Sequence, residues 1–518
     1  MPWDTDLAHQ GRRSDSNGKR GAVASESSIC SRIGVDIIGI GGTAADAMVA
    51  TTLCVGTIGM YHSGIGGGGF MLVRDKHGRY ETIDYRETAP AAASRDMYGG
   101  DDQASIIGGL AVGVPGELRG LQYLHRKYGA LPWKTLVMPS VRIARYGFQV
   151  TEDLVRYMKS ASVNDTFLVS DPVWAEDFAP NAKSMIDHIR LKNGTMTLDD
   201  LRNYTVEVKP PLSITYRDFR LFATEAPSSG AVLLSMLKTM DQYPVQDLAD
   251  SNLTTHRFVE AMKFAYGARQ QLGDPAFIRH METYQQQMLS DDQARQIRHR
   301  ILDNQTQPVE AYNPESVYAA ESEGTSHIVT ADSSGLTVTS TTTINLLFGA
   351  RIMTPDTGII LNNEMNDFSL PNKNNSFGFP PSPSNFISPR KRPLSSITPL
   401  IVEHACNGTL FFATGAAGGS RIISATAQAA WHVLASAKSM RDAIAAPRLH
   451  HQLMPDVLLV EQGLGFDNAT FADLKSKGHN VEWIAPGLSA VQGVMRFGDG
   501  RFDAVGETRQ VNSGGYTI

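Results

Sequence analysis

Apolar positions along the chain change their spacing near residue 325. Between about residues 110 and 310 they recur with the period of amphipathic helices, for example over residues 133–146, 231–243 and 255–272. After Thr325 the pattern is that of strands. Two runs rich in Val, Ile and Thr are separated by Ser333-Ser334-Gly335, and this predicts a β-hairpin. The chain therefore combines helices with sheet.

The first hundred residues are rich in small side chains. An alanine-rich stretch after Gly41-Gly42 predicts a packed helix, and a glycine loop over residues 64–69 precedes a short buried strand at residues 70–73. A second strand is predicted over residues 80–85 and ends at Arg86. The most apolar stretch, residues 37–60, contains several glycines and a central aspartate, so it predicts a buried helix rather than a membrane span.

Composition is that of a globular protein. Hydrophobic residues make up 42% of the 518 residues and charged residues 19%, and the net charge of −6 excludes the basic footprint of a nucleic-acid-binding protein. One basic cluster, Arg390-Lys391-Arg392, lies in a proline-rich stretch and is expected to be solvated. The surrounding residues 370–393 are expected to form a flexible flap.

Two features of the sequence give opposite indications of the cellular location. Residues 1–20 are polar, lack the apolar core of a signal peptide and are predicted to be a disordered leader. In contrast, eight Asn-x-Ser/Thr sequons occur where 20 asparagines would give about three by chance, and sequons mark secreted glycoproteins. We therefore expect a secretory, vacuolar or extracellular protein, with a cytoplasmic one as the alternative. The sequons begin at Asn164, Asn193, Asn203, Asn252, Asn304, Asn374, Asn407 and Asn468.

Three cysteines are too few for a disulfide framework. They are Cys30, Cys54 and Cys406, and the odd number leaves at least one thiol free or paired between chains. Cys54 lies in an apolar run, where we expect a small buried hydrophobic side chain.

Candidate chemistry is concentrated in six short blocks that follow one another along the chain. Each block alone has an ordinary structural explanation: an arginine in a surface ion pair, two serines capping a helix, or two acids on a solvated helix face. The blocks contain Arg86, Gly324-Thr325, Asn345 with Thr343, Glu364 with Asp367, Ser395-Ser396 and Gly418-Gly419.

Taken together and in this order, the blocks resemble the γ-glutamyltranspeptidase family. The resemblance extends from about Gly21 to the last residues. It implies an α+β fold, the αββα sandwich of N-terminal-nucleophile hydrolases, and a precursor cut at Gly324–Thr325. Residues 21–324 would form the large subunit and residues 325–518 the small one, and the two would remain associated as a heterodimer. No cofactor and no metal are implied.

The resemblance also assigns catalytic roles. Thr325 would be the nucleophile, and its α-amine, freed by cleavage, would act as the base. Thr343 corresponds to a second threonine that hydrogen-bonds the first. The backbone N–H groups of Gly418 and Gly419 would form the oxyanion hole. The reaction would be a ping-pong transfer of the γ-glutamyl group of glutathione or its conjugates to water, an amino acid or a peptide.

Binding roles follow in the same way. Arg86 matches the clamp for the substrate carboxylate, completed by Ser395 and Ser396. Asn345, Glu364 and Asp367 match the pocket for the substrate ammonium. The chain departs from the family at Asn366, where an aspartate is usual.

Three alternatives stay open. A β-lactam or glutaryl acylase of the same fold is disfavoured, because a glutaryl group has no ammonium for Glu364 and Asp367. An uncleaved pseudoenzyme is disfavoured by the intact Gly324-Thr325. An enzyme that trims glutathione adducts in a dedicated biosynthetic pathway remains compatible with every residue. The glycine loop at 64–69 also fits a dinucleotide fingerprint, but a strand rather than a helix is predicted after it.

Overall fold

The computed structural model describes most of the chain: residues 18–163, 167–171, 174, 182–313, 317–318, 324–371, 373–374 and 380–518. The predicted leader lies outside the described residues as far as residue 17. Residues 18–20 contact the main body, because the carbonyl of Gly18 accepts from the Phe502 N–H at 2.8 Å and the Arg20 N–H donates to the carbonyl of Ile518 at 2.6 Å.

Two large sheets form the centre of the molecule. The first has the strand order β16-β1-β7-β8-β2-β3-β4 and the second has the order β15-β14-β10-β9-β6-β5, both fully antiparallel; a small sheet, β11-β12-β13, lies apart. The strands are β1 (Gly21–Ser25), β2 (Gly68–Arg74), β3 (Tyr80–Asp84), β4 (Glu207–Lys209), β5 (Leu212–Tyr216), β6 (Phe219–Ala223), β7 (Ser326–Asp332), β8 (Thr337–Thr343), β9 (Leu400–His404), β10 (Leu410–Ala417), β11 (Leu449–His450), β12 (Leu458–Glu461), β13 (Val481–Ile484), β14 (Ala490–Arg496), β15 (Phe502–Val505) and β16 (Gly514–Thr517).

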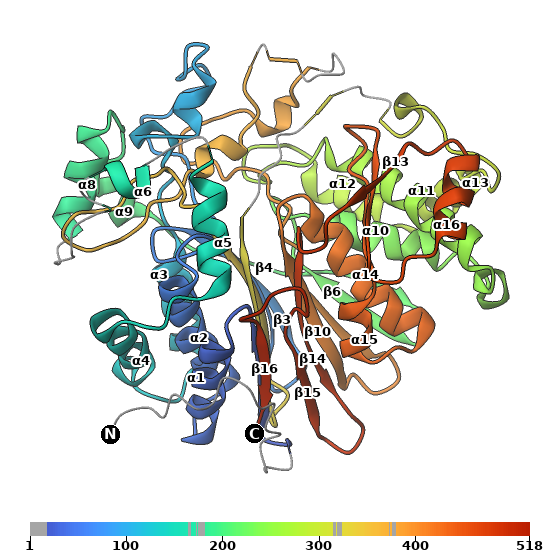
Figure 1. The fold of residues 1–518 in the computed structure, drawn as a ribbon, viewed down its shortest axis with the longest axis horizontal. Helices are drawn as coiled ribbons and strands as arrows, with labels where there is room; N and C mark the ends of the chain where they lie inside the picture. Colours follow the sequence, from blue (N-terminus) through green and yellow to red (C-terminus); the bar gives the residue numbers. More distant parts are fainter. Residues whose placement is uncertain are drawn as a thin grey trace.

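Helices cover the outer face of each sheet (Figure 1). Helices α1, α2 and α3 pack on the first sheet, whereas α10, α14 and α15 pack on the second, and β7 and β8 face β10 across the middle. The layers are therefore α, β, β and α. The helices are α1 (Ser28–Gly39), α2 (Ala44–Ile58), α3 (Glu117–Tyr128), α4 (Trp133–Tyr146), α5 (Glu152–Ala161), α6 (Phe167–Ser170), α8 (Ala182–Leu191), α9 (Leu198–Asn203), α10 (Gly230–Met240), α11 (Ser251–Arg269), α12 (Met281–Met288), α13 (Asp291–Arg300), α14 (Arg421–Ser436), α15 (Met440–Ala445) and α16 (Asn468–Ser476).

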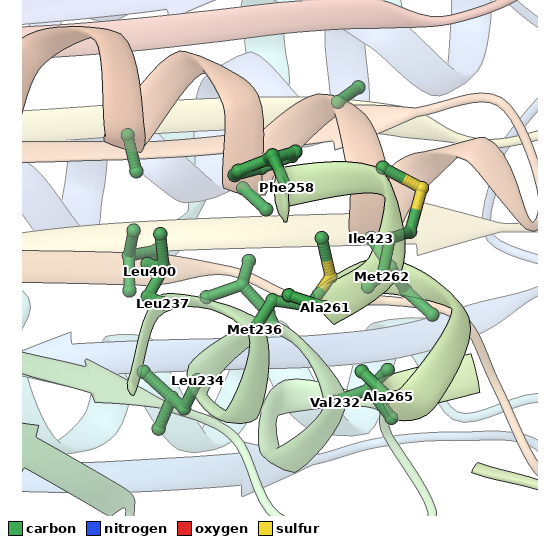
Figure 2. Close-up of a cluster of buried hydrophobic side chains, with 14 of the residues drawn as sticks. Val232, Leu234, Met236, Leu237, Phe258, Ala261, Met262, Ala265, Leu400 and Ile423 are labelled. Atoms are coloured by element: carbon green, nitrogen blue, oxygen red, sulfur yellow. The ribbon is translucent and has the colours of Figure 1, made fainter. Parts of the chain in front are cut away.

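Separate apolar clusters fill the spaces between layers. The largest contains side chains of α10, α11, α14 and β9, among them Val232, Phe258, Ile423 and Leu400 (Figure 2). Its side chains are withdrawn from water almost completely, and burial of this kind contributes roughly 1.5–3 kcal/mol for each large apolar side chain. This packing keeps the second sheet rigid beneath its helices.

Alternation along β7 decides which side chains face the other sheet. Ile328 belongs to the cluster under α2, whereas Val329 and Ala331 belong to the cluster between the sheets. Because successive strand residues point to opposite faces, His327 and Thr325 share the side of Val329 and Ala331. The start of β7 therefore presents Thr325 toward the second sheet.

The elements predicted from periodicity are confirmed. Residues 133–146 form α4, residues 231–243 and 255–272 contain α10 and most of α11, and the hairpin after Thr325 is β7 and β8. Strand β2 begins at Gly68, within the glycine loop at residues 64–69, so a strand rather than the helix of a dinucleotide fingerprint follows this loop.

The prediction for the basic cluster is wrong at two of its three residues. Lys391 and Arg392 are buried, and only Arg390 is exposed. Arg392 forms ion pairs with Asp84 at 3.3 Å and Glu207 at 2.7 Å, and the Lys391 ammonium donates to two backbone carbonyls. Acidic partners from distant segments offset the cost of burying Arg392, and backbone carbonyls satisfy the Lys391 ammonium.

The segment 370–393, predicted to be a flexible flap, lies partly outside the described residues. Its later part is packed, because Asn385 donates to the carbonyl of Asp367 at 2.7 Å and accepts from the Leu394 N–H at 3.0 Å.

The prediction that Cys54 is a small buried side chain is confirmed, but the disulfide that it forms was not predicted. The disulfide joins Cys54 to Cys30 and so links α2 to α1, with a Cα–Cα distance of 5.4 Å. Cys406 is the remaining free thiol and is exposed. In the part of the chain that the structure describes, no helix is both long and apolar enough to span a bilayer.

Candidate active site

The site begins where the chain enters β7. Gly324 has a φ of +117°, and a Cβ at this position would lie 2.2 Å from the carbonyl oxygen of Asn345. Only glycine fits such a close approach at a positive φ. Thr325 follows and is almost buried, with 6% of its surface exposed.

Two hydrogen bonds hold the Gly324–Thr325 peptide from opposite sides. The backbone N–H of Gly418 donates to the Thr325 hydroxyl oxygen at 3.0 Å. The Thr343 hydroxyl donates to the carbonyl oxygen of Gly324 at 2.7 Å. Thr343 was expected to bond the Thr325 side chain, but in the intact chain its hydroxyl contacts the preceding carbonyl instead.

Gly418 and Gly419 occupy the turn between β10 and α14. Both have positive φ values, +124° and +61°, and a Cβ on Gly418 would lie 2.5 Å from the carbonyl of Leu488. The turn directs the Gly418 N–H toward the start of β7, and helix α14 begins two residues after Gly419, at Arg421. A glycine turn at a helix N-terminus is suited to stabilising negative charge.

The other predicted residues gather around Arg86, which follows β3. Its guanidinium forms ion pairs with both Glu364 and Asp367, and all three side chains are buried. The two acids lie on the short 3-10 helix η6 (Glu364–Asp367). The predicted carboxylate clamp and the predicted ammonium pocket therefore pair with each other in this structure, and substrate binding by these three residues stays a prediction.

A chain of hydrogen bonds connects this cluster to Thr325. The Asn345 N–H donates to the Thr343 hydroxyl at 2.7 Å, and the Asn345 side-chain amide donates to the carbonyl of Asn363, next to Glu364, at 3.0 Å. Asn345 has a φ of +70°, a conformation that asparagine tolerates better than most residues. Asn366 lies in the same turn and bonds Ser105 at 2.8 Å.

Ser395 and Ser396 are buried beside the cluster. The carbonyls of the two residues before them, Pro393 and Leu394, accept from the Arg86 guanidinium at 3.5 and 3.4 Å. The Ser396 hydroxyl accepts from Arg269 at 2.9 Å. All eleven predicted site residues therefore lie in two connected groups, one around Thr325 and one around Arg86.

Burial sets the protonation of the acids around Arg86. It raises the pKa of Glu364 well above its usual range, although Arg86 opposes the shift. It also raises the pKa of Glu87 and that of Glu117 to about 8 each. The guanidinium keeps a raised pKa despite burial, since Glu364 and Asp367 stabilise its charge. One cation therefore faces more carboxyl groups than it can neutralise, and the cluster favours an additional positive charge.

Sequence reasoning missed two residues of this region. Glu87 lies 3.8 Å from the Arg86 guanidinium and is fully buried, and only its adjacency to Arg86 could have indicated it. Arg269 ends α11 and bonds both Ser396 and Ser229. In the sequence, the indication of Arg269 was a charged residue at the end of a helix that is otherwise buried.

One group of side chains within the described residues has the spacing of metal ligands. His256, Glu260 and His479 are buried, and one ligand atom from each lies within 4.8 Å of the others. The two imidazoles bond each other at 2.8 Å, and the Glu260 carboxylate accepts from Thr306 and Tyr312. These ligand atoms thus have protein partners, and none of the predicted site residues belongs to this group.

Two sheets packed between helical layers, with a threonine at the head of a central strand, define the fold of an N-terminal-nucleophile hydrolase. Cephalosporin acylase from Bacillus halodurans has a similar solved structure, with a TM-score of 0.80 and 22% identity over 100% of this chain and 99% of that one. At that identity the likeness concerns the fold alone.

Sequence comparison identifies the family. Residues 30–183 and 181–516 match γ-glutamyltranspeptidase. The chain is 47% identical to a glutathione hydrolase proenzyme of Arthroderma benhamiae, over 97% of this chain and 93% of that protein. It is 43% identical to a glutathione hydrolase of Aspergillus flavus, over 98% and 91% of the two. The chain belongs to the γ-glutamyltranspeptidase family.

Proposed function

We propose that this protein is a γ-glutamyltransferase with glutathione hydrolase activity, which cuts itself between Gly324 and Thr325. The observation that carries the proposal is the pair of hydrogen bonds at this peptide. One fixes the Thr325 hydroxyl oxygen on Gly418, and the other fixes the Gly324 carbonyl on Thr343.

This geometry suits an N-to-O acyl shift. The Thr325 hydroxyl oxygen attacks the Gly324 carbonyl carbon, and the hydroxyl proton passes to the departing backbone nitrogen. The Thr343 hydroxyl stabilises the negative charge that develops on the carbonyl oxygen. The resulting ester is opened by water, which leaves a carboxylate on Gly324 and a free α-amine on Thr325.

Turnover uses the same threonine. A free α-amine has a reference pKa of about 7.7–8.0, so it can accept the hydroxyl proton near neutral pH. The hydroxyl oxygen attacks the γ-carbonyl of the donor, and a γ-glutamyl ester forms as the amine of the remaining peptide leaves. Gly418 and Gly419 donate N–H groups to the oxyanion. Water or an acceptor amine then releases glutamate or a new γ-glutamyl compound.

The amino-acid end of the donor would bind at the cluster around Arg86. Asn345, Glu364 and Asp367 each have one buried oxygen without a hydrogen-bond partner: Oδ1, Oε2 and Oδ1 respectively. An ammonium supplies three donors and one positive charge. Its binding would release Arg86 from its two acids, and the guanidinium would then pair with the donor's α-carboxylate.

The relatives support the choice of donor and the division into two subunits. Two of them carry the name glutathione hydrolase, and one of these is described as a proenzyme. We infer that glutathione or its conjugates supply the γ-glutamyl group and that residues 21–324 and 325–518 remain together as a heterodimer.

Self-cleavage is tested with purified protein and a Thr325→Ala variant on a denaturing gel. The expected result is a small fragment of 194 residues that begins Thr-Ser-His-Ile and is absent from the variant. A single intact band for both proteins would overturn the proposal and favour the pseudoenzyme.

Substrate class is tested by comparing a chromogenic γ-glutamyl anilide with the glutaryl anilide, which lacks only the α-ammonium. We expect kcat/KM to favour the γ-glutamyl compound by more than 100-fold, and an Asp367→Asn variant to lose most of this preference. Equal rates for the two anilides in the wild-type enzyme would point to an acylase instead.

A further inference from the structure

Ser326 lies on the opposite face of β7 from Thr325 and is fully buried. Because successive strand residues point to opposite faces, its side chain shares the face of Ile328, which packs under α2. There the Ser326 hydroxyl donates to Oε1 of Glu26 at 2.6 Å and accepts from the Ser63 hydroxyl at 3.0 Å. The residue after the nucleophile is therefore held by side chains from two other segments.

Glu26 directly follows β1, the strand that pairs with β7. Its side chain is buried, and its second oxygen, Oε2, lies 3.4 Å from Nδ1 of His62. A Cβ on Gly59 would lie 2.5 Å from Oε1, so the loop after α2 passes close to the carboxylate only because residue 59 is glycine. Each oxygen of the acid thus has its own partner, as the burial of a charged group requires.

The loop that carries His62 also holds the end of β8. The backbone carbonyl of His62 accepts from the N–H of Ile344 at 3.0 Å, and Ile344 directly follows Thr343. Glu26 is therefore connected by short series of contacts to the residue after each threonine of the site. One series runs through Ser326, and the other runs through His62.

Cleavage would increase the importance of this anchor. In the intact chain the Thr343 hydroxyl holds the Gly324 carbonyl at 2.7 Å, which restrains Thr325 from its N-terminal side. After cleavage Thr325 would be a chain end, and chain ends fray unless they are tied down. The ladder between β7 and β8 starts at Ser326. The hydrogen bond from Ser326 to Glu26 would then restrain the chain at the residue next to the nucleophile.

We infer that Glu26 is a positioning residue of the cut enzyme, which acts through Ser326 to keep the Thr325 hydroxyl aligned with the N–H of Gly418. The inference rests on the proposed function and extends it to the far face of the nucleophile strand. Glu26 acts by accepting a hydrogen bond and transfers no proton. Glutamine, which retains an acceptor oxygen of the same reach, can therefore replace it, whereas leucine cannot.

The test compares kcat and KM of purified, cut variants on a chromogenic γ-glutamyl anilide. Ser326→Ala removes the donor of the anchoring hydrogen bond, and Glu26→Leu removes its acceptor. Each should lower kcat about 10- to 100-fold, the scale on which a small misplacement of a reacting group acts. KM should stay within about twofold, since the substrate cluster is untouched. Glu26→Gln should keep a kcat close to that of the wild type.

Self-cleavage provides a second measurement on the same variants. It should slow less than turnover does, because the Thr343 hydroxyl still restrains the Gly324 carbonyl in the precursor. The matched control is Thr330→Val. Thr330 lies on the same face of β7, is buried, and donates to the carbonyl of Ala44 at 2.8 Å. Its replacement also removes one buried hydrogen bond, but away from the start of the strand, and should leave kcat unchanged.

A kcat for Ser326→Ala equal to that of Thr330→Val would overturn the inference, and so would equal losses in Glu26→Gln and Glu26→Leu. Thermal unfolding identifies a variant that does not fold, and Ser326→Ala, which removes a single oxygen atom, keeps the comparison decisive if Glu26→Leu is lost in this way. Failure of the proposed function gives a different result, because the wild-type protein itself would then remain uncut and inactive.

Discussion

The imidazole of His327 occupies the space that Gly415 leaves open in the facing sheet. A Cβ on Gly415 would lie 2.3 Å from the ring. The ring cannot turn away, because its two nitrogens bond Thr341 at 2.7 Å and Thr339 at 3.1 Å, both on β8. His327 lies two residues after Thr325 and Gly415 three residues before Gly418, so this contact sets the distance between the nucleophile strand and the oxyanion turn.

We predict that Gly415→Ala lowers the free energy of unfolding by about 1–3 kcal/mol and slows self-cleavage, because the added methyl group must push the two sheets apart. Thermal unfolding and the fraction of cut chain measure the two effects. Gly498→Ala is the matched control, since nothing lies within 4 Å of a Cβ at that position. If Gly415→Ala unfolds and cuts like the control, the contact does not determine the spacing.

Thr343→Val should slow self-cleavage about 100-fold, the typical effect of removing one oxyanion donor. Valine has the shape of threonine but cannot donate to the Gly324 carbonyl. The measurement is the time course of cleavage in freshly folded precursor. Thr343→Ser retains the hydroxyl and should cut nearly as fast as the wild type. Equal rates for the valine and serine variants would exclude a role for this hydrogen bond.

Arg86→Gln should destabilise the protein by about 3–5 kcal/mol, because Glu364 and Asp367 would remain buried without their cation. Denaturant unfolding at pH 7 gives the change. Adding Glu364→Gln and Asp367→Asn to the same chain should restore most of the stability, since the remaining neighbour Glu87 has a pKa raised by burial to about 8 and is mostly uncharged at pH 7. A triple variant as unstable as Arg86→Gln would show that packing, rather than charge, accounts for the loss.

Glu117→Gln should remove part of the pH dependence of stability. Burial raises the pKa of Glu117 from 4.5 to about 8. Between these two values the folded state binds more protons than the unfolded state, so the stabilising contribution is complete below pH 4.5 and is lost as the pH rises through 8. One group changes the free energy of unfolding by at most about 1.4 kcal/mol per pH unit.

Unfolding free energies at pH 5 and pH 8 check this prediction. The glutamine variant should lose less stability over this interval than the wild type, and it can still accept the hydrogen bond from Thr342. Glu482→Gln, at an exposed position, should behave like the wild type. A wild-type protein as stable at pH 8 as at pH 5 would contradict the assignment.

The features that sequence reasoning predicted are those with local causes. The period of apolar residues set the limits of α4, and the alternation around a serine-glycine turn defined the β7–β8 hairpin. The burial of Arg392 could not be predicted, because its partners Asp84 and Glu207 come from remote segments. The disulfide was missed for a similar reason: three cysteines allow three pairings, and only the packing of α1 on α2 selects Cys30 and Cys54.

In the site, too, the sequence predicted which residues take part but not the contacts between remote segments. Its residues were predicted from their order along the chain, but their unliganded arrangement was not. The pairing of Arg86 with Glu364 and Asp367 depends on bringing residues some 280 positions apart into one buried cluster. The contact of Thr343 with Gly324 depends on the peptide still being intact.

The order of strands determines whether the two segments on either side of residue 324 can separate while the protein stays folded. In the first sheet, β1 lies between β16 and β7, and β2 adjoins β8, so strands from before and after residue 324 pair at three places. In the second sheet, β6 of the first segment pairs with β9 of the second. A cut at residue 324 would therefore release nothing. Unfolding of the cut protein would then yield two separate polypeptides. Refolding would require their association, which is a second-order process whose rate falls on dilution. Cutting would convert a reversible fold into a kinetically trapped one.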